Sequence, residues 1–399
     1  MADIKSDELY METALELAEL GRGTTNPNPM VGALLIKDGA EVGKGFHKKA
    51  GTPHAEAIAL SNAGDAAEGA TLYVNLEPCC HRDKLTPPCT DAIIKAKVAR
   101  VVVGMVDPNP KVSGRGVQAL KDAGIEVAVG VLRGRCERLN EAFTKRITTG
   151  LPFVTMKVAE TLDGKIATST GESKWITGPE ARRKSHIMRN EADAILVGIG
   201  TVLRDDPSLT TRIEGADGTR DPHRIILDSH LRIPLDAKVL NLDSTAKTYV
   251  ATTVSAPTHK MKEIKARKGS ILIIDEVDGR VSFPGLMEEL ARMGMTQVLV
   301  EGGARINAEA LGSGVVDKVM FFIAPKIMGG DDSRGAIGGK SPDTLGDTVM
   351  LRDVQVSKAG DDILVEGYVV KPGEVIAPDA EKPGAEKPAH KRKRRRRKH

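Results

Sequence analysis

The feature that most constrains the fold of this 399-residue chain is a set of histidine, cysteine and proline residues between positions 53 and 89. The chain has Pro-His-Ala-Glu at 53–56, Glu-Pro-Cys-Cys at 77–80 and Pro-Pro-Cys at 87–89. One imidazole and two thiols would give a tetrahedral Zn²⁺ three protein ligands and leave a fourth position for water. We therefore predict that His54, Cys79 and Cys89 hold one zinc ion. Any fold of the chain must then bring these separated segments together.

Glu56 is placed to be the proton carrier of this site. It follows the histidine by two residues, as the non-ligand glutamate does in the H-x-E…P-C signature of zinc deaminases. The prolines at 53, 87 and 88 suit the entry to a helix, so each ligand is expected to open one. A helix N-terminus lowers the pKa of a thiol and favours the thiolate that zinc needs. The pattern therefore predicts a catalytic zinc site for hydrolytic deamination.

Two other interpretations of the cysteines stay open. The usual signature has two residues between its cysteines, whereas nine separate Cys79 from Cys89. Cys80 or His81 could supply a fourth ligand and make the zinc structural, or the cysteines could be buried apolar side chains without a metal. A structural site would leave Glu56 without a role, and adjacent cysteines would chelate one tetrahedral ion awkwardly. We therefore favour the catalytic interpretation.

The composition is that of an ordinary globular protein. Hydrophobic residues make up 40% and charged residues 28% of the chain, and the length allows two domains with separate cores. No stretch approaches the apolar length of a membrane span, and the acidic N-terminus lacks the apolar core of a signal peptide. Three of the four cysteines belong to the proposed site, which argues against a disulfide framework and for a cytoplasmic protein.

The first part of the chain alternates between short strands and helices. The pattern predicts helices at 8–20, 54–63, 90–97, 116–123 and 132–148, and strands at 31–36, 41–46, 71–76, 101–103 and 125–129. This alternation predicts an α/β domain with a mixed sheet and helices on both faces. Residues 114–119 fit a loose G-x-G-x-x-A dinucleotide fingerprint, but no strand directly precedes them, so we reject the match.

A second series follows the break at 149–152, where we place the domain boundary. Helices are predicted near 179–190, 284–293 and 306–311, and strands at 153–159, 194–197, 224–227, 248–251, 271–274, 297–300 and 318–323. Val-Glu-Gly-Gly at 300–303 joins a strand to a helix. Such a turn exposes backbone N–H groups that can hold a pyrophosphate, although an ordinary tight turn could have the same sequence.

Residues 371–399 differ in composition from the rest. They contain eleven Lys or Arg and four Asp or Glu, so this segment carries +7 and residues 1–370 carry −3 of the chain's total of +4. Prolines interrupt the segment, and residues 391–398 are all basic. We predict a disordered basic tail at 371–399, after domains at 1–149 and 150–370.

Two sets of motifs resemble the bifunctional riboflavin-biosynthesis deaminase/reductase family, over roughly residues 8–370. The first set is His-Ala-Glu at 54–56, Leu-Glu-Pro-Cys-Cys-His at 76–81 and Thr-Pro-Pro-Cys at 86–89. The second is Thr-Leu-Asp-Gly-Lys at 161–165, Ser-Lys-Trp-Ile-Thr at 173–177, Thr-Val-Leu-Arg-Asp-Asp-Pro at 201–207 and the motif at 300–303. The resemblance implies a cytidine-deaminase-like three-layer α/β/α domain, followed by a dihydrofolate-reductase-like α/β domain that uses NADPH.

By matching position, the resemblance also implies which residues bind each ligand. NADPH would contact Ala159, Trp175, Thr201, Asp205, Ser229 and the turn made by Gly303, Ala304, Arg305, Ile306, Asn307, Ala308 and Glu309. The deaminase substrate, through its pyrimidine or its ribosyl phosphate, would contact Asn28 and His47, although Asn28 could also be a simple turn residue between two prolines. Lys84 would be the basic residue that contacts this substrate, with Arg82 as the alternative in a segment that departs from the family pattern. The ribosyl phosphate in the second domain would contact Ser173, Arg189, Leu209, Arg212 and Glu301. Two arginines suit a phosphate because a planar guanidinium forms paired charge-assisted bonds.

The resemblance implies two successive reactions. The first domain would deaminate 2,5-diamino-6-ribosylamino-4(3H)-pyrimidinone 5′-phosphate, and the second would use NADPH to reduce the ribosyl group to ribityl. We expect small-molecule pyrimidine partners, no membrane, a homo-oligomer, and weak non-specific RNA contact through the tail.

Two rival functions deserve a test. One is an RNA-base deaminase fused to an unrelated reductase, and the other is a nucleic-acid-binding protein that works through the basic tail. Aromatic residues make up only 3% of the chain and residues 1–370 are mildly acidic. Both features disfavour a surface on which nucleic-acid bases stack.

Overall fold

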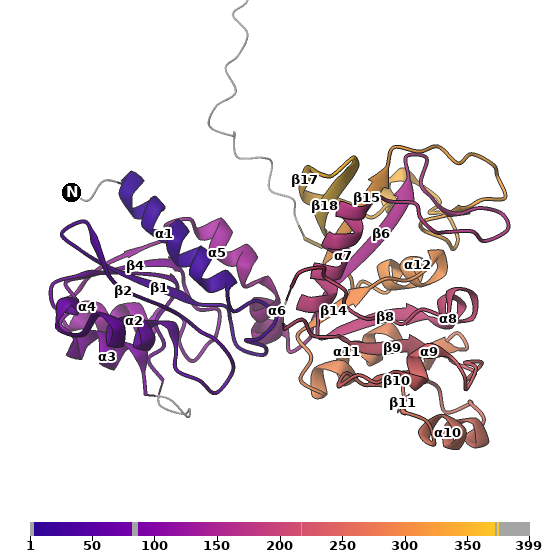
Figure 1. Ribbon diagram of the computed structural model, residues 1–399, viewed down its shortest axis with the longest axis horizontal. Helices are drawn as coiled ribbons and strands as arrows, with labels where there is room; N and C mark the ends of the chain where they lie inside the picture. Colours follow the sequence, from indigo (N-terminus) through magenta and orange to yellow (C-terminus); the bar gives the residue numbers. More distant parts are fainter. Residues whose placement is uncertain (1–3, 82–86, 217, 372, 375–399) are drawn as a thin grey trace, which may run out of the picture.

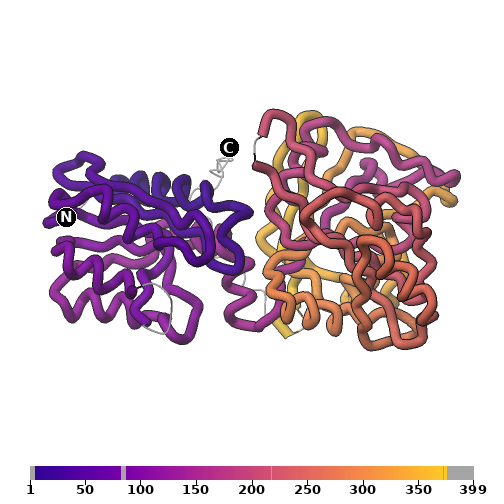
Figure 2. The backbone as a smooth tube through the Cα atoms, turned by 60° about the horizontal axis from the view of Figure 1, so that its bottom comes forward, coloured from indigo at the N-terminus to yellow at the C-terminus, as the bar shows by residue number. Residues whose placement is uncertain are grey.

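The computed structural model describes residues 4–81, 87–216, 218–371 and 373–374. Within these residues two large sheets follow one another along the chain, each with its own hydrophobic core. Figure 1 shows the two sheets, and the backbone in Figure 2 shows the two halves of the chain side by side. Arg82, Lys84 and almost all of the predicted tail lie outside the described residues. Among the described helices, none is long and apolar enough to cross a bilayer.

The first large sheet has five strands in the order β2-β1-β3-β4-β5. Its strands are β1 (Gly32–Lys37), β2 (Ala40–Phe46), β3 (Thr71–Leu76), β4 (Arg100–Met105) and β5 (Glu126–Val129). The pairs β2-β1 and β1-β3 are antiparallel, whereas β3-β4 and β4-β5 are parallel. The predicted mixed sheet is therefore confirmed. Asp38 and Gly39 both have positive φ, which suits the tight turn between β1 and β2.

Helices cover both faces of this sheet, as predicted (Figure 1). One face carries α1 (Ile4–Glu19) and α5 (Arg133–Leu139); the other carries α2 (Ala55–Ala63), the short turn η1 (Gly64–Ala67), α3 (Cys89–Lys95) and α4 (Arg115–Asp122). Helix α2 lies so close to β2 that a Cβ on Gly45 would be 2.7 Å from the carbonyl oxygen of Ala55, and only glycine fits there. This close packing fixes the start of α2, where two predicted site residues lie.

The predicted helix at 132–148 is wrong as a single helix. The chain forms α5 and then α6 (Glu141–Thr149), separated at Asn140. The buried side chain of Asn140 accepts the N–H of Met30 at 2.8 Å and donates to the carbonyl of Met30 at 3.0 Å. These bonds fix Asn140 in a non-helical turn, because a buried amide must be paired. Helical periodicity cannot reveal a contact so distant in the sequence.

The second large sheet has nine strands in the order β11-β10-β9-β8-β14-β6-β15-β18-β17. Their bounds are β6 (Phe153–Thr161), β8 (Ala194–Gly198), β9 (His223–Leu227), β10 (Thr248–Thr252), β11 (Gly269–Ile273), β14 (Gln297–Val300), β15 (Lys318–Ala324), β17 (Leu351–Ala359) and β18 (Asp362–Val369). Neighbours from β11 to β15 pair in parallel, and β15, β18 and β17 pair antiparallel. Strand β8 is buried along its whole length, which explains its unbroken apolar sequence.

Most predicted elements of the second half are confirmed, but several others have no clear sequence signal. Helices α7 (Pro179–Glu191), α11 (Phe283–Arg292) and α12 (Ala304–Gly312) match predicted ones. The pattern does not predict α8 (Ile199–Asp205), α9 (Lys238–Asn241), α10 (Thr258–Lys265), the hairpin of β17 and β18, the short strands β7 (Lys165–Ala167), β12 (Glu276–Val277), β13 (Arg280–Val281) and β16 (Arg334–Gly335), or the turn η2 (Leu345–Asp347). Strand β17 is mostly exposed at the sheet edge, so burial does not impose an alternating pattern on it.

Helix α6 joins the two halves. It ends at Thr149, and β6 begins at Phe153. Lys145 of α6 places its Nζ 2.5 Å from both carboxylate oxygens of Asp317, which also accepts the N–H of Val154 at 2.8 Å. The hydroxyl of Tyr368 donates to Glu141. Buried polar contacts therefore tie α6 to strands of the second sheet.

Candidate metal centre and cofactor cleft

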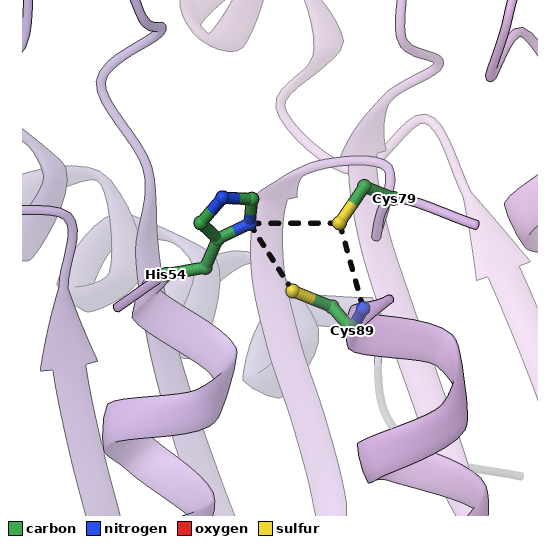
Figure 3. A group of neighbouring side chains, drawn as sticks. All are labelled: His54, Cys79 and Cys89. Carbon is green, nitrogen blue, oxygen red and sulfur yellow. Dashed lines mark hydrogen bonds between the residues drawn. The ribbon is translucent and has the colours of Figure 1, made fainter. Parts of the chain in front are cut away.

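The three predicted metal ligands come from three elements of the first half (Figure 3). His54 is the N-cap of α2, and Cys89 is the first residue of α3, as predicted. The expectation of a helix start is wrong for Cys79, which lies in the loop after β3. Its Sγ instead accepts the backbone N–H of Cys89 at 3.5 Å. The N-terminus of α3 therefore favours the thiolate of both cysteines.

The spacing of the ligand atoms fits a tetrahedral zinc ion. Nδ1 of His54 lies 3.5 Å from Sγ of Cys79 and 3.3 Å from Sγ of Cys89. Zn–S bonds of about 2.3 Å and a Zn–N bond of about 2.1 Å, at tetrahedral angles, separate sulfur from nitrogen by roughly 3.6 Å. These ligand atoms all lie within 4.8 Å of one another. The structure thus brings the three predicted ligands together in an arrangement that zinc can occupy.

Glu56 lies beside these ligands. Its side chain is buried, and it lines a cavity of about 590 Å³ together with His54 and Cys79. Burial and the nearby Cys79 sulfur raise the pKa of the Glu56 carboxyl. A raised pKa suits a carboxyl group that must both accept and return protons.

Asn28 and His47 line the same cavity and contact each other. Nδ2 of Asn28 lies 3.0 Å from Nε2 of His47, and Nδ1 of His47 lies 3.2 Å from the carbonyl oxygen of Pro53. Because a carbonyl can only accept, Nδ1 carries the proton and Nε2 accepts from the Asn28 amide. Burial lowers the pKa of His47, which favours this neutral form. The chain of bonds ends at the residue before His54.

A second cavity, of about 820 Å³, lies where β8 and β9 end and α12 begins. The predicted cofactor residues that line it are Thr201, Ser229, Gly303, Ala304, Arg305, Ile306 and Glu309. Besides Arg305, four more arginines line it, namely Arg204, Arg232, Arg280 and Arg334. A cleft with so many cations fits an anionic dinucleotide.

The two glycines before α12 have different reasons to lack a side chain. A Cβ on Gly302 would lie 2.4 Å from Ile306, so this glycine allows close packing. Gly303 is the N-cap of α12, and a Cβ there would meet nothing within 4 Å. The open backbone at Gly303 can approach a diphosphate, and the α12 N-terminus favours its negative charge.

Five other predicted cofactor residues are not in the lining of this cavity: Ala159, Trp175, Asp205, Asn307 and Ala308. The amide of Asn307 is buried and donates to the carbonyl of Ala336 at 3.0 Å. The Trp175 ring is 65% exposed and lies 4.7 Å from the guanidinium carbon of Arg182. Cofactor contacts by these five residues stay predictions.

Predicted substrate residues of the second half gather around Glu301. Nε and Nη2 of Arg189 donate to its two carboxylate oxygens at 2.7 and 3.0 Å, and Nη1 donates to the carbonyl of Thr210, next to Leu209. Nζ of Lys157 lies 3.5 Å from the same carboxylate. Burial opposes ionisation, but Arg189 and Lys157 outweigh it and hold the pKa of Glu301 at about 2. Glu301 is therefore a permanent anion that orients Arg189.

Arg212 approaches this group through His186. The backbone N–H of Arg212 donates to Nδ1 of His186 at 3.2 Å, and the Arg212 side chain is exposed. Burial and the charges of Arg189 and Arg212 lower the pKa of His186 to about 4. Ser173 is half-buried in the segment before α7. Because Arg189 is engaged with Glu301, Arg212 is the more accessible of the two arginines.

Comparison with known proteins identifies the family. Residues 4–105 match the cytidine and deoxycytidylate deaminase zinc-binding region, and residues 152–365 match the RibD C-terminal domain. The riboflavin biosynthesis protein RibD of Aquifex aeolicus is 46% identical over 359 residues, which cover 90% of this chain and 97% of that protein. The chain belongs to the RibD family. The corresponding RibD protein of Escherichia coli is 40% identical, with 90% and 98% of the two chains covered.

Solved RibD structures have the same architecture. RibD of Acinetobacter baumannii has a TM-score of 0.79 at 37% identity and covers 92% of this chain and 100% of its own. The diaminohydroxyphosphoribosylaminopyrimidine deaminase/5-amino-6-(5-phosphoribosylamino)uracil reductase of Thermotoga maritima has a TM-score of 0.79 at 38% identity and covers 92% and 99%. The predicted family, fold class, zinc and NADPH are thereby confirmed. As a RibD protein, this chain is a bifunctional deaminase and reductase of riboflavin biosynthesis.

The RibD deaminase cavity is also lined by residues for which the sequence predicts no role in the site: Glu77, Asp107, Asn109, Phe143, Arg146 and Ile147. The buried carboxylate of Glu77 accepts the backbone N–H groups of Asp107, Gly114 and Val117 at 3.1, 2.9 and 3.0 Å. Burial raises the pKa of Asp107 to about 6. The position of Glu77 directly before the Pro-Cys pair could have indicated a role in the site. The lining residues from α6 have no such motif next to them in the sequence.

The glycine pattern at 114–119 also has a packing reason in this RibD chain. A Cβ on Gly116 would lie 2.1 Å from the carbonyl oxygen of Pro78. The glycine therefore lets α4 approach the cysteine loop, and no dinucleotide fingerprint is needed to explain it.

Cys80 stays apart from the ligand group. It is half-buried and is not among the three described residues whose ligand atoms converge. Burial raises the pKa of its thiol, which disfavours the thiolate. The arrangement thus supports three ligands and the catalytic interpretation of the RibD zinc site.

Proposed function

We propose that this RibD enzyme deaminates 2,5-diamino-6-ribosylamino-4(3H)-pyrimidinone 5′-phosphate and then reduces the ribosyl group of the product to ribityl. The observation that carries the proposal is the approach of His54 Nδ1 to both thiols, at 3.5 and 3.3 Å, beside the buried Glu56. The name of the Thermotoga maritima relative contains the same two activities. The domain limits 1–149 and 150–370 and the tail at 371–399 belong to this proposal.

Deamination exchanges a ring amine for oxygen, so it consumes water and releases ammonia. When bound by His54, Cys79 and Cys89, zinc would supply the Lewis acidity that lowers the pKa of a water molecule. Glu56 would accept one proton from that water and transfer it to the ring nitrogen, and would then move the remaining hydroxyl proton to the amine, which departs as ammonia while the new C=O bond forms. The raised pKa of Glu56 makes the return of the proton easier.

Asn28 and His47 orient the pyrimidine in the same cavity. The neutral His47 accepts from Asn28 and donates to the backbone at Pro53, so its ring cannot rotate freely. Lys84, or Arg82, would form an ion pair with the substrate phosphate.

In the reductase domain, the cleft before α12 would hold NADPH, which supplies the hydride for C1′ of the ribosyl group. Gly303 and the N-terminus of α12 bind its diphosphate. Glu301 keeps Arg189 in one orientation, and Arg189 and Arg212 face the substrate phosphate. Because Glu301 and Gly303 belong to one turn, substrate and cofactor would lie side by side in this proposal.

The test is a pair of assays, each with its own substrate. Ammonia release from the diaminopyrimidine should disappear when zinc is removed by a chelator and return when zinc is added. NADPH oxidation on the separately supplied deaminated compound should be unaffected by the chelator. Full deamination by zinc-free enzyme, or activity on RNA in place of the pyrimidine, would contradict the proposal.

We also propose that the eight consecutive basic residues at 391–398 bind RNA weakly and without sequence specificity. The affinity should fall steeply with salt, because counterion release dominates such binding. A truncation that ends at residue 371 should lose this contact and keep both enzyme activities, because no residue assigned to either site lies beyond 370.

A homo-oligomer and a cytoplasmic location complete the proposal. Val354 and Val356 on the edge strand β17 are 51% and 69% exposed, which suits a second copy at this edge. Sedimentation at micromolar concentration would distinguish a dimer from a monomer. The four cysteines, all within the described residues, are not joined in disulfides, as expected in a reducing compartment.

A further inference from the structure

A loop of the deaminase domain rests directly on the reductase domain. In the loop after α1, Nδ2 of Asn26 donates to Oδ1 of Asp193 at 2.8 Å. Gly23 in the same loop packs so closely that a Cβ would lie 3.0 Å from the carbonyl oxygen of Asn190, and its φ is positive. Arg22 adds an ion pair to Glu191 at 3.6 Å. The loop thus docks on the C-terminal end of α7 and on the segment that joins α7 to β8.

Asp193 is held rigidly before it meets Asn26. Its Oδ2 accepts three bonds from its own domain, from the N–H and hydroxyl of Thr296 at 2.7 and 2.8 Å and from the N–H of Gln297 at 3.1 Å. Its side chain is only 12% exposed. The carboxylate therefore cannot rotate without losing these bonds, and Oδ1 is a fixed acceptor at the domain boundary.

The docked loop continues into the deaminase cavity. Asn28 lies two residues after Asn26 and lines that cavity. Its amide contacts Nε2 of His47, whose other nitrogen reaches the carbonyl of Pro53, directly before the ligand His54. A displacement of Asn26 would therefore move the amide that fixes His47.

We propose that Asp193, a residue of the reductase domain, is a positioning residue for the deaminase site. Through its bond to Asn26 it sets the Asn28 amide against His47 and against the pyrimidine. The inference rests on the proposed function, in which Asn28 and His47 contact that pyrimidine. If Asp193 has this role, binding of the deaminase substrate depends on a contact with the other domain. Binding of zinc by its three ligands does not depend on that contact.

The test uses the full-length enzyme with the substitution Asn26→Asp. This change keeps the size of the side chain but places a second carboxylate against Asp193. The KM for ammonia release should rise about tenfold, the equivalent of one good hydrogen bond, and kcat should change less than about twofold. Zinc content and the kinetics of NADPH oxidation on the deaminated compound should not change.

A rescue and a control complete the design. Adding Asp193→Asn to Asn26→Asp supplies an amide that can donate to the new carboxylate, while its oxygen still accepts from Thr296 and Gln297, so KM should recover. Arg22→Ala removes the ion pair at the same interface and should leave KM unchanged.

Three results would overturn the inference: an unaltered KM in Asn26→Asp, no recovery in the double variant, or an equal rise in KM with Arg22→Ala. A wild-type enzyme that releases no ammonia would instead overturn the proposed function itself.

Discussion

The deaminase and reductase sites each contain a buried glutamate, and the two glutamates behave in opposite ways. Glu56 lies among an imidazole and sulfur atoms, with its charge opposed by burial and by Cys79, so the pKa of its carboxyl is raised. Glu301 lies between Arg189 and Lys157, which overcome burial and hold its pKa at about 2. The same side chain thus has a raised pKa, which suits the proton carrier we propose, in one domain and is a fixed anion in the other. Neighbouring charges, and not the residue type, decide the role.

The sites also differ in how they are assembled. The zinc ligands lie at helix starts and in one loop within a short stretch of chain, between His54 and Cys89. The reductase cleft is formed at the ends of β8 and β9, at the start of α12 and by the turn near Arg280. The first site depends on a few local turns, whereas the second depends on the alignment of the parallel strands β8 and β9 with the turn before α12.

The largest effect should come from Glu56→Gln. The amide keeps the size of the side chain but cannot accept and return protons. Deamination should fall on the order of 10³–10⁴-fold or more, because one residue serves several proton transfers. Ammonia release measures this loss, while metal analysis and NADPH oxidation on the deaminated compound should match the wild type. Loss of reduction in this variant would mean that the two sites are not separate.

Removal of a zinc ligand should be nearly as severe. Cys89→Ser takes away one of three ligands and should leave the enzyme with little zinc and little deaminase activity. Cys80→Ser is the matched control, since Cys80 lies outside the converging group. Metal content by mass spectrometry checks both variants. An equal loss of zinc from both would show that Cys80 is also a ligand.

A moderate effect is expected at the other glutamate. Glu301→Gln keeps the shape but leaves Arg189 and Lys157 without their anion, in a place where the Glu301 side chain is 10% exposed. The unfolding free energy should fall by about 1–3 kcal/mol, and the KM for the ribosyl phosphate should rise. Chemical denaturation measures the first, with Glu289→Gln as the control because its partner Arg292 is 67% exposed. Equal destabilisation by both variants would argue against a special role for the Glu301 pair.

The smallest effect concerns pH. The pKa of His186 is about 4 in the folded enzyme and lies near its ordinary value of 6.5 in the unfolded chain. Between these values the unfolded state binds more protons, so stability should fall as the pH drops from about 6.5 toward 4. Because His186 is partly exposed, solvent screening should keep the change within about 1 kcal/mol.

His186→Gln should flatten this part of the stability curve, and His259→Gln, at an exposed position, should not. Melting temperatures measured across this pH range test the difference. The same slope in His186→Gln as in the wild type would show that other groups cause it.

The sequence by itself predicted the three side chains whose ligand atoms converge and the strands of the mixed sheet that carries them. Ligand chemistry permits few side chains, and prolines and helix starts place His54 and Cys89 locally. Apolar runs such as β8 marked the buried strands, because a parallel strand covered on both faces must be apolar throughout. These signals depend on neighbouring residues, so one chain is enough to find them.

Only the tertiary structure decided the contacts between distant segments. The break at Asn140 follows from its bonds to Met30, and the buried Glu77 holds the backbone of the loop that leads to α4. The bond between Asn26 and Asp193 joins residues of different domains. Each depends on a polar partner far along the chain, and the free energy of pairing a buried polar group leaves no periodic pattern in the sequence.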